Sequence, residues 1–295
     1  MKIIECVPNF SEGRDETVLS GITEALEAAG GVRIMDKSRD PDHNRSVVTF
    51  LGPPEAVVRA AGAACGKALE RIDMRKHGGG HPRIGAVDVV PFIPVRGMTM
   101  DETVSLARGF GHAIGEKYRV PVYFYGKAAL RPERQKLAFL RKGGYEGLRK
   151  RIGDPLWTPD AGLAAFNEKS GAMAVGARDY LIAFNVNLAT GDLAIAREIA
   201  ARVRQSGGGL DHVQAMGVFL ESRNVAQVSM NLTNYRVTSI RTAYEAVKRE
   251  AAKRGVGVLE SELIGCLPRE ALADGEAEEL NICGFCRERF IESHF

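Results

Sequence analysis

The polar and apolar residues of the first hundred positions follow two different spacings. Short β-rich runs are separated by segments in which apolar residues recur every three or four positions, as they do on one face of a helix. We predict strands at 3–7, 32–36, 46–51 and 84–95, and helices at 17–29 and 53–72. The polar run between the second and third strands, 37–44, predicts the loop of a hairpin. The predicted order is therefore β-α-β-β-α-β.

The second half of the chain repeats this order with different residues. Strands are predicted at 180–188, 213–220, 225–232 and 256–259, and helices at 192–205 and 240–254. Between the two repeats we expect a helix at 100–117, a strand at 121–125, short helices to about 151 and a Trp-, Pro- and Gly-rich connector at 153–175. Both repeats match the split βαβ, ferredoxin-like arrangement. We predict an α/β (α+β) fold of two βαββαβ subdomains, 1–178 and 179–295.

Two strands of the second repeat are polar on one face. The polar positions that alternate with apolar ones are Asn185, Asn187, Gln227, Ser229 and Asn231. The absence of Lys and Glu from these positions favours a face that lines a ligand cleft between the two halves. An ordinary solvated sheet face is the alternative interpretation.

Composition and charge exclude several classes of protein. The 295 residues are 45% hydrophobic and 26% charged, which excludes a disordered, collagen-like or coiled-coil chain. A net charge of +3 suits an anionic small molecule as well as nucleic acid. Uncharged stretches of about a dozen residues are too short to span a membrane, and five sparse cysteines indicate reduced thiols. We expect a cytoplasmic protein.

The loop that precedes the strand at 84–95 carries the densest chemistry. It holds two histidines and an arginine around three glycines, in the sequence KHGGGHPR at 76–83. A loop histidine beside arginine is a candidate general base, since its pKa lies near neutrality. A helix C-cap with a solvated histidine is the alternative. A metal site is disfavoured, because the glycines prevent a helix that would align His77 with His81.

Other polar clusters carry weaker signals. The residues 9–13 and 40–45 could reach a cleft, although Asn, Asp, Ser and Gly also favour ordinary turns. Cys283 and Cys286 form only half of a zinc pattern. The aromatic strand of an RNA-binding ferredoxin-like domain is missing, so we expect no nucleic-acid partner.

Six stretches of the chain carry long motifs. They are ECVPNFSEG at 5–13, NRSV at 44–47, HPRIGAVDVVPF at 81–92, GAR at 176–178, IAFNVNL at 182–188 and QVSMNL at 227–232. Together they closely resemble the glutamate formimidoyltransferase family over about residues 2–270. Many animal members carry a fused cyclodeaminase domain, for which we expect no room in this chain.

The resemblance implies transfer of a formimidoyl group from N-formimidoyl-L-glutamate to nitrogen-5 of tetrahydrofolate, in histidine degradation. Tetrahydrofolate is then a co-substrate, and no metal is required. The resemblance also implies a homodimer, with a folate tunnel between the sheets of an N-terminal subdomain (1–178) and a C-terminal subdomain (179–295).

The resemblance places the catalytic histidine of the family on His81. The folate-contacting stretch falls on Gly162, Leu163, Ala164, Ala165, Phe166, Asn167, Glu168, Lys169, Ser170 and Gly171. For the remaining substrate contacts we expect Asn9, Asn44, Arg83, Arg178, Asn185, Asn187, Gln227 and Asn231. The two arginines suit carboxylates, because a guanidinium offers a planar fork of donors.

Two motifs depart from the family pattern. Gly80 stands where the family usually has a glutamate before His-Pro-Arg, and PDAGL at 159–163 replaces Pro-Asp-Phe-Gly-Pro. Two alternatives therefore stay open: folate-dependent formyl transfer from a different donor, and a non-catalytic folate-binding protein.

Overall fold

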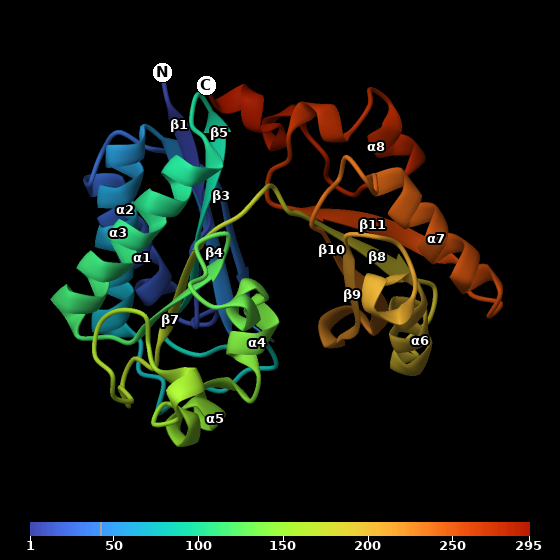
Figure 1. The fold of residues 1–295 in the computed structure, drawn as a ribbon. Coiled ribbons are helices and arrows are strands. Elements are labelled where there is room, and N and C mark those ends of the chain that lie inside the picture. The colour runs from blue at the N-terminus through green and yellow to red at the C-terminus, as the bar shows by residue number, and fades with distance from the viewer. Residues whose placement is uncertain (42) are drawn as a thin grey trace. The chain divides into compact units, whose positions relative to one another are not determined.

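The structure is a computed structural model that describes residues 1–41 and 43–295. Asp42, which belongs to the polar cluster at 40–45, lies outside the described residues. The chain divides into two units, Met1–Arg178 and Asp179–Phe295 (Figure 1). Within the described residues, no helix is long and apolar enough to cross a membrane.

The first unit is built around a mixed seven-stranded sheet. Its elements are β1 (Ile3–Cys6), β2 (Asn9–Phe10), α1 (Glu16–Ala28), β3 (Arg33–Asp40), β4 (Arg45–Gly52), α2 (Pro54–Arg71), β5 (Val87–Arg96), α3 (Met100–Tyr118), β6 (Val122–Gly126), α4 (Leu137–Arg141), α5 (Gly144–Arg151) and β7 (Met173–Ala177). β1 and β2 both pair with β4 and β5, so they form one strand line that Pro8 interrupts by removing a backbone N–H. β7 pairs in parallel with β5 and β6, and β3 pairs with β4.

Helices cover both faces of this sheet to different extents. α1, α2 and α3 pack on one face, against the buried side chains of Phe10, Phe50, Phe92 and Phe124. A smaller cluster on Tyr123 involves α4, α5 and Trp157. Side-chain caps set the helix starts: Asp15 caps α1, and Thr99 begins α3 with a capping box. Burial of these apolar faces supplies the main stabilisation of the unit.

The second unit is a four-stranded antiparallel sheet. Its elements are β8 (Ile182–Leu188), α6 (Leu193–Val203), β9 (Val213–Leu220), β10 (Val225–Leu232), α7 (Ile240–Ala252), β11 (Val258–Ile264) and α8 (Glu276–Glu279). The strand order is β11-β8-β10-β9. α6 and α7 pack on the face that carries Phe184, Val186, Val228 and Met230.

The β-α-β-β-α-β order predicted for each half is confirmed, with β1 and β2 counted as one strand. The predicted loop 37–44 is partly wrong, because β3 continues to Asp40 at the edge of the sheet, where polar side chains keep contact with water. The predicted connector 153–175 includes the start of β7, which the sequence did not predict as a strand. Its small residues Ala174 and Gly176 have low strand propensity. β11 is also longer than predicted and ends at Ile264. The ligand tunnel expected between the two sheets stays a prediction.

Candidate functional site

The histidine loop lies between the end of α2 and the start of β5, against the turn that joins β3 to β4. A Cβ atom at Gly79 would clash with the carbonyl oxygen of His43, so only glycine permits this close approach. Gly13 meets the carbonyl oxygen of Asp40 in the same way. The three loops that carry residues 9–13, 40–45 and 76–83 therefore come together at one end of the sheet.

Asn44 joins these loops. Its backbone is left-handed, with a φ of 49°, a conformation that asparagine tolerates better than most residues. The side-chain oxygen accepts a hydrogen bond from the N–H of Gly13 at 2.9 Å, and the side-chain nitrogen donates to the carbonyl of Gly78 at 3.0 Å. Both ends of the amide are used, so Asn44 positions the site, and its predicted substrate contact stays a prediction.

His77 is fixed by partners on both ring nitrogens. Nε2 donates to the carbonyl of Asn44 at 2.9 Å, because a carbonyl oxygen only accepts. Nδ1 must then accept the hydrogen bond from Nε of Arg83 at 3.1 Å, so the ring is neutral. Burial lowers the pKa of His77, in agreement with this tautomer.

Arg83 is already held by a carboxylate of the same chain. Its terminal nitrogens donate to Glu146 of α5 at 3.0 and 2.7 Å, a bidentate pair. The hydrogen bonds from Arg83 lower the pKa of Glu146. A substrate carboxylate at Arg83 would have to compete with Glu146.

His81 differs from His77 in that its Nδ1 atom is buried and has no hydrogen-bond partner. Its ring meets the ring of His43 edge to face, with 6.1 Å between the centroids. Burial, followed by the positive charges of Arg45 and Arg141, lowers the pKa of His81 to about 2. The imidazole is therefore neutral at physiological pH, and its Nδ1 atom has no hydrogen-bond partner among the described residues.

Two arginines from different elements surround His81 with positive charge. Arg141 of α4 donates from Nε to the Oδ2 atom of Asp88 at 3.0 Å, and also from its terminal nitrogen. The Oδ1 atom of Asp88 accepts the N–H of Ile84 at 2.9 Å, which fixes the backbone that leads out of the histidine loop. Arg45 of β4 donates to the side-chain oxygen of Asn9, while its Nε atom is buried without a partner. Burial lowers the pKa of Arg45 to about 10, so it stays charged.

Neither Arg141 nor Glu146 was predicted as a site residue from the sequence. Each lies on a short helix whose pattern predicts nothing about its partner. Asp88 carried a usable signal, since a carboxylate inside the apolar run IGAVDVV needs a paired cation. Arg45 stood in the NRSV motif but was not singled out.

The predicted folate segment, 162–171, has its last residues beside the chain that leads into β5. The carbonyl of Ser170 accepts the N–H of Ala86 at 2.9 Å, and the N–H of Ala172 donates to the carbonyl of Ile84 at 3.0 Å. Gly171, with a φ of 66°, lies so close to Ile84 that a side chain would clash with its carbonyl oxygen. The segment thus ends shortly before β7 and lies beside Ile84, three residues after His81 in the sequence, while Ala164 and Ala165 are exposed.

Arg178 lies away from the histidine loop, directly after β7. Its N–H donates to the carbonyl of Phe92 at 3.2 Å. Burial raises the pKa of Glu5 on β1 to about 7, against the opposing charge of Arg178. Arg178 therefore belongs to a buried cluster with Glu5 and Tyr125, farther along β5.

The polar residues of the second sheet bond to one another. Gln227 donates to the Oδ1 atom of Asn187 at 2.8 Å, and Asn187 donates to Glu260 and Glu262 of β11 at 2.9 and 2.8 Å. The face is therefore not uncharged as expected, because β11 adds two carboxylates that its short predicted length left out. Asn185 is buried on β8, and Asn231 is half-buried on β10.

Cys283 also reaches this face of the second sheet. Its Sγ atom donates to Glu260 at 2.8 Å. Hydrogen bonds from Cys283, Asn187 and Arg223 lower the pKa of Glu260 to about 2. No group of three or more His, Cys, Asp or Glu side chains in the described part of the chain is arranged to hold a metal ion.

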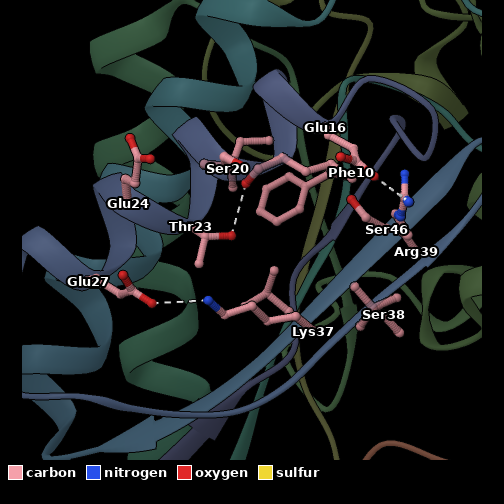
Figure 2. Close-up of a pocket in the computed structure, with 14 residues that line it drawn as sticks. Phe10, Glu16, Ser20, Thr23, Glu24, Glu27, Lys37, Ser38, Arg39 and Ser46 are labelled. Atoms are coloured by element: carbon pink, nitrogen blue, oxygen red, sulfur yellow. Dashed lines mark hydrogen bonds and ion pairs between the residues drawn. The ribbon is translucent and has the colours of Figure 1, made fainter.

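A separate cavity of about 470 Å³ lies between α1 and the β3–β4 hairpin. Figure 2 shows polar side chains at its rim, where Lys37 pairs with Glu27 at 3.0 Å and Arg39 pairs with Glu16 at 2.5 Å. Phe10 and the buried Ser46 line its floor. His81 does not line this cavity, so the cavity is separate from the histidine loop.

Comparison with known proteins identifies relatives along nearly the whole chain. The formiminotransferase domain, N-terminal subdomain, matches residues 3–178, and the formiminotransferase domain matches residues 183–278. Glutamate formimidoyltransferase of Thermoplasma acidophilum is 45% identical over 99% of this chain and 97% of its own length. The Streptococcus pyogenes protein of the same name is 42% identical over 99% and 98%. Formimidoyltransferase-cyclodeaminase of Rattus norvegicus is 45% identical, and the match covers 52% of that longer protein.

Proposed function

The chain belongs to the formiminotransferase family, and we propose that it transfers the formimidoyl group of N-formimidoyl-L-glutamate to nitrogen-5 of tetrahydrofolate. The observation that carries this proposal is the match to two glutamate formimidoyltransferases along nearly their full length. The products are 5-formimidoyltetrahydrofolate and L-glutamate. Tetrahydrofolate is a co-substrate, and the reaction requires no change of oxidation state.

The chemistry needs one group that accepts a proton and then returns it. Nitrogen-5 of tetrahydrofolate attacks the amidine carbon, and a tetrahedral intermediate forms as nitrogen-5 loses its proton. The bond between that carbon and the glutamate nitrogen then breaks, and the departing amine takes up a proton. A single base positioned beside both nitrogens can serve both steps, worth about 10²- to 10⁴-fold in rate. Holding both substrates together supplies a larger part of the acceleration.

His81 is the group that we assign to this proton transfer. Its Nδ1 atom is buried, unpartnered and neutral, whereas both nitrogens of His77 are occupied. The surrounding arginines favour an anionic substrate such as the donor, which carries two carboxylates. Together these features support a catalytic role for His81 and a positioning role for His77.

We assign the folate wall to the segment 162–171, in which the carbonyl of Ser170 accepts the N–H of Ala86 just before β5. Arg83 and Arg178 remain proposed carboxylate contacts, with Glu146 and Glu5 as their competing partners. Asn9, Asn44, Asn185, Asn187, Gln227 and Asn231 remain proposed hydrogen-bonding contacts of the substrates. A homodimer in the cytoplasm that acts in histidine degradation and one-carbon metabolism completes the proposal.

Gly80 gives one specific reason to consider a second donor molecule. The family pattern has a glutamate at this position, and a Cβ atom at Gly80 would meet no atom within 4 Å, so the loop has room for that side chain. Its absence removes a carboxylate that could raise the pKa of His81. Formyl transfer from N-formylglutamate or 5-formyltetrahydrofolate is therefore the second candidate.

The test is a steady-state assay of wild type and His81→Ala in three reactions. The products measured are 5-formimidoyltetrahydrofolate from formimidoylglutamate and tetrahydrofolate, 5-formyltetrahydrofolate from N-formylglutamate and tetrahydrofolate, and N-formylglutamate from 5-formyltetrahydrofolate and L-glutamate. We expect turnover with formimidoylglutamate that falls by about 10²- to 10⁴-fold in His81→Ala, while tetrahydrofolate still binds. Turnover with a formyl donor alone would favour the second candidate. Binding of tetrahydrofolate without turnover of any donor would identify a binding protein.

A further inference from the structure

The three arginines near the histidine loop differ in how much of their guanidinium is used. Arg83 is held by Glu146 through both terminal nitrogens, and its Nε atom donates to His77. Arg141 is held by Asp88 through Nε and a terminal nitrogen. Both forks are therefore satisfied by groups of this chain.

Among the described residues, no carboxylate forms an ion pair with Arg45, although the charges of Asp88 and Asp40 act on its guanidinium. One terminal nitrogen donates to Asn9, a neutral amide, and the Nε atom is buried without a partner. A buried guanidinium N–H without an acceptor is unfavourable, and such groups usually mark a place where a ligand supplies what is missing.

Arg45 and His81 line one tightly closed pocket, together with Phe10, Ser11, His43 and Asp88, which has room for a ligand only when the side chains around it move. The pocket thus contains two buried nitrogen atoms without partners, Nε of Arg45 and Nδ1 of His81. One can only donate, and the other is the proton acceptor of the proposed reaction. An anionic oxygen on Arg45 would place the rest of the same molecule beside His81.

We propose that Arg45 binds a carboxylate of the formimidoyl donor and thereby holds its amidine beside His81. This inference rests on the proposed function and adds a residue that sets the choice of donor. It assigns one of the two donor carboxylates to Arg45, whose guanidinium has an unpartnered N–H. Arg83 would have to release Glu146 before it could bind a carboxylate.

The same contact would prepare His81 for proton transfer. The groups that act on its ring from the surrounding elements are Arg45, Arg141 and His43, with Asp88 paired to Arg141 and Asp40 paired to His43. A carboxylate on Arg45 offsets the nearest unpaired positive charge, so the pKa of His81 rises when the donor binds. The base then becomes effective in the loaded enzyme.

The test compares two donors in each variant: formimidoylglutamate, and formamidine, which has the reacting carbon but no carboxylate. Arg45→Gln removes the charge, and Arg45→Lys keeps the charge without the fork. Arg39→Gln, on the neighbouring strand, is the matched control, since Arg39 pairs with the exposed Glu16. Tetrahydrofolate is saturating throughout, and inhibition by the product L-glutamate is measured in parallel.

We expect Arg45→Gln to lower kcat/KM for formimidoylglutamate by about 10- to 100-fold relative to kcat/KM for formamidine, with a matching loss of L-glutamate inhibition. Loss of the Arg45 charge raises the pKa of His81 for both donors alike, so the ratio of the two donors isolates the carboxylate contact. Arg45→Lys should lie between wild type and Arg45→Gln, and Arg39→Gln should behave as wild type. The ratio of the two donors does not depend on the fraction of enzyme that is folded, so poor folding of a variant cannot imitate this result.

An equal loss for both donors, or unchanged inhibition by L-glutamate, would overturn the role of Arg45 while leaving the proposed function intact. A wild-type protein without turnover of formimidoylglutamate would instead overturn the proposed function, and this inference with it.

Discussion

His77 donates a hydrogen bond from Nε2 to the backbone carbonyl of Asn44, 2.9 Å away. This bond separates the roles of two histidines that the sequence presents as similar, since it commits His77 to holding the loop. His81, four residues later, has a ring nitrogen without a hydrogen-bond partner among the described residues, as the proposed proton transfer requires.

His77→Ala should therefore lower stability. The variant leaves the carbonyl of Asn44 and the Nε atom of Arg83 without their partners, at a cost of about 1–3 kcal/mol. Urea denaturation of His77→Ala and His81→Ala, with kcat measured on each, checks this. We expect a lower midpoint for His77→Ala and a nearly unchanged one for His81→Ala. The reverse order of stabilities would contradict the assignment.

Gly80→Glu should raise the pKa of His81. The position has open space for a side chain, and a carboxylate beside the ring favours the imidazolium form. The shift can be followed by NMR titration of the His81 ring, together with the pH profile of kcat/KM. Gly78→Glu is the control, since Gly78 is equally unobstructed. Equal shifts in both variants would show that the effect is not specific to position 80.

Asp160→Asn should destabilise the first unit and loosen the predicted folate segment. Asp160 forms a buried ion pair with Arg134 at 2.6 Å, and its Oδ2 atom accepts the N–H of Phe124 at 2.8 Å. Loss of one partner leaves a buried guanidinium uncompensated, which costs about 3–5 kcal/mol. Denaturant unfolding and tetrahydrofolate affinity measure the two effects, with the exposed Glu133→Gln as control. An unchanged unfolding midpoint would be incompatible with this role.

Glu5→Gln should remove a pH dependence of stability. Burial raises the pKa of Glu5 from 4.5 to about 7, so the folded protein keeps a proton that the unfolded chain releases. The free energy of unfolding therefore falls as pH rises from about 4.5 to 7, by up to about 3 kcal/mol, and stays low above that range. Unfolding measured at pH 5 and pH 8 checks this. Wild type should lose more stability than Glu5→Gln between the two values, and parallel losses would contradict the argument.

Helices and strands were predictable where their apolar side chains recur at regular spacing because they face an apolar core. α1 and β8 are examples, because their periodicity needs no knowledge of their neighbours. β7 was not predictable, since a strand between two others can consist of small residues such as Ala174 and Gly176. The predicted end of β3 came too early, because the polar residues at its end lie at the sheet edge and resemble a loop in the sequence.

The site was predictable in its residue types and less so in its connections. The motif around His81 marks the loop, and the polar positions Asn187 and Gln227 do share a sheet face. Which carboxylate meets which arginine depends on tertiary contacts between distant segments, as for Arg83 with Glu146 or Asp88 with Arg141. A single sequence carries no record of such pairs.

The left-handed turn at Asn44 also bears on how the protein folds. Its hydrogen bonds reach Gly13, 31 residues earlier, and Gly78, 34 residues later, so each closes a long loop of chain. One loop contains all of α1 and the other all of α2. The entropy lost in closing such loops is recovered only when the sheet and both helices have formed. The histidine loop therefore takes its final shape at a late stage of folding, and a nascent chain that has not yet completed β5 has no reactive site to expose.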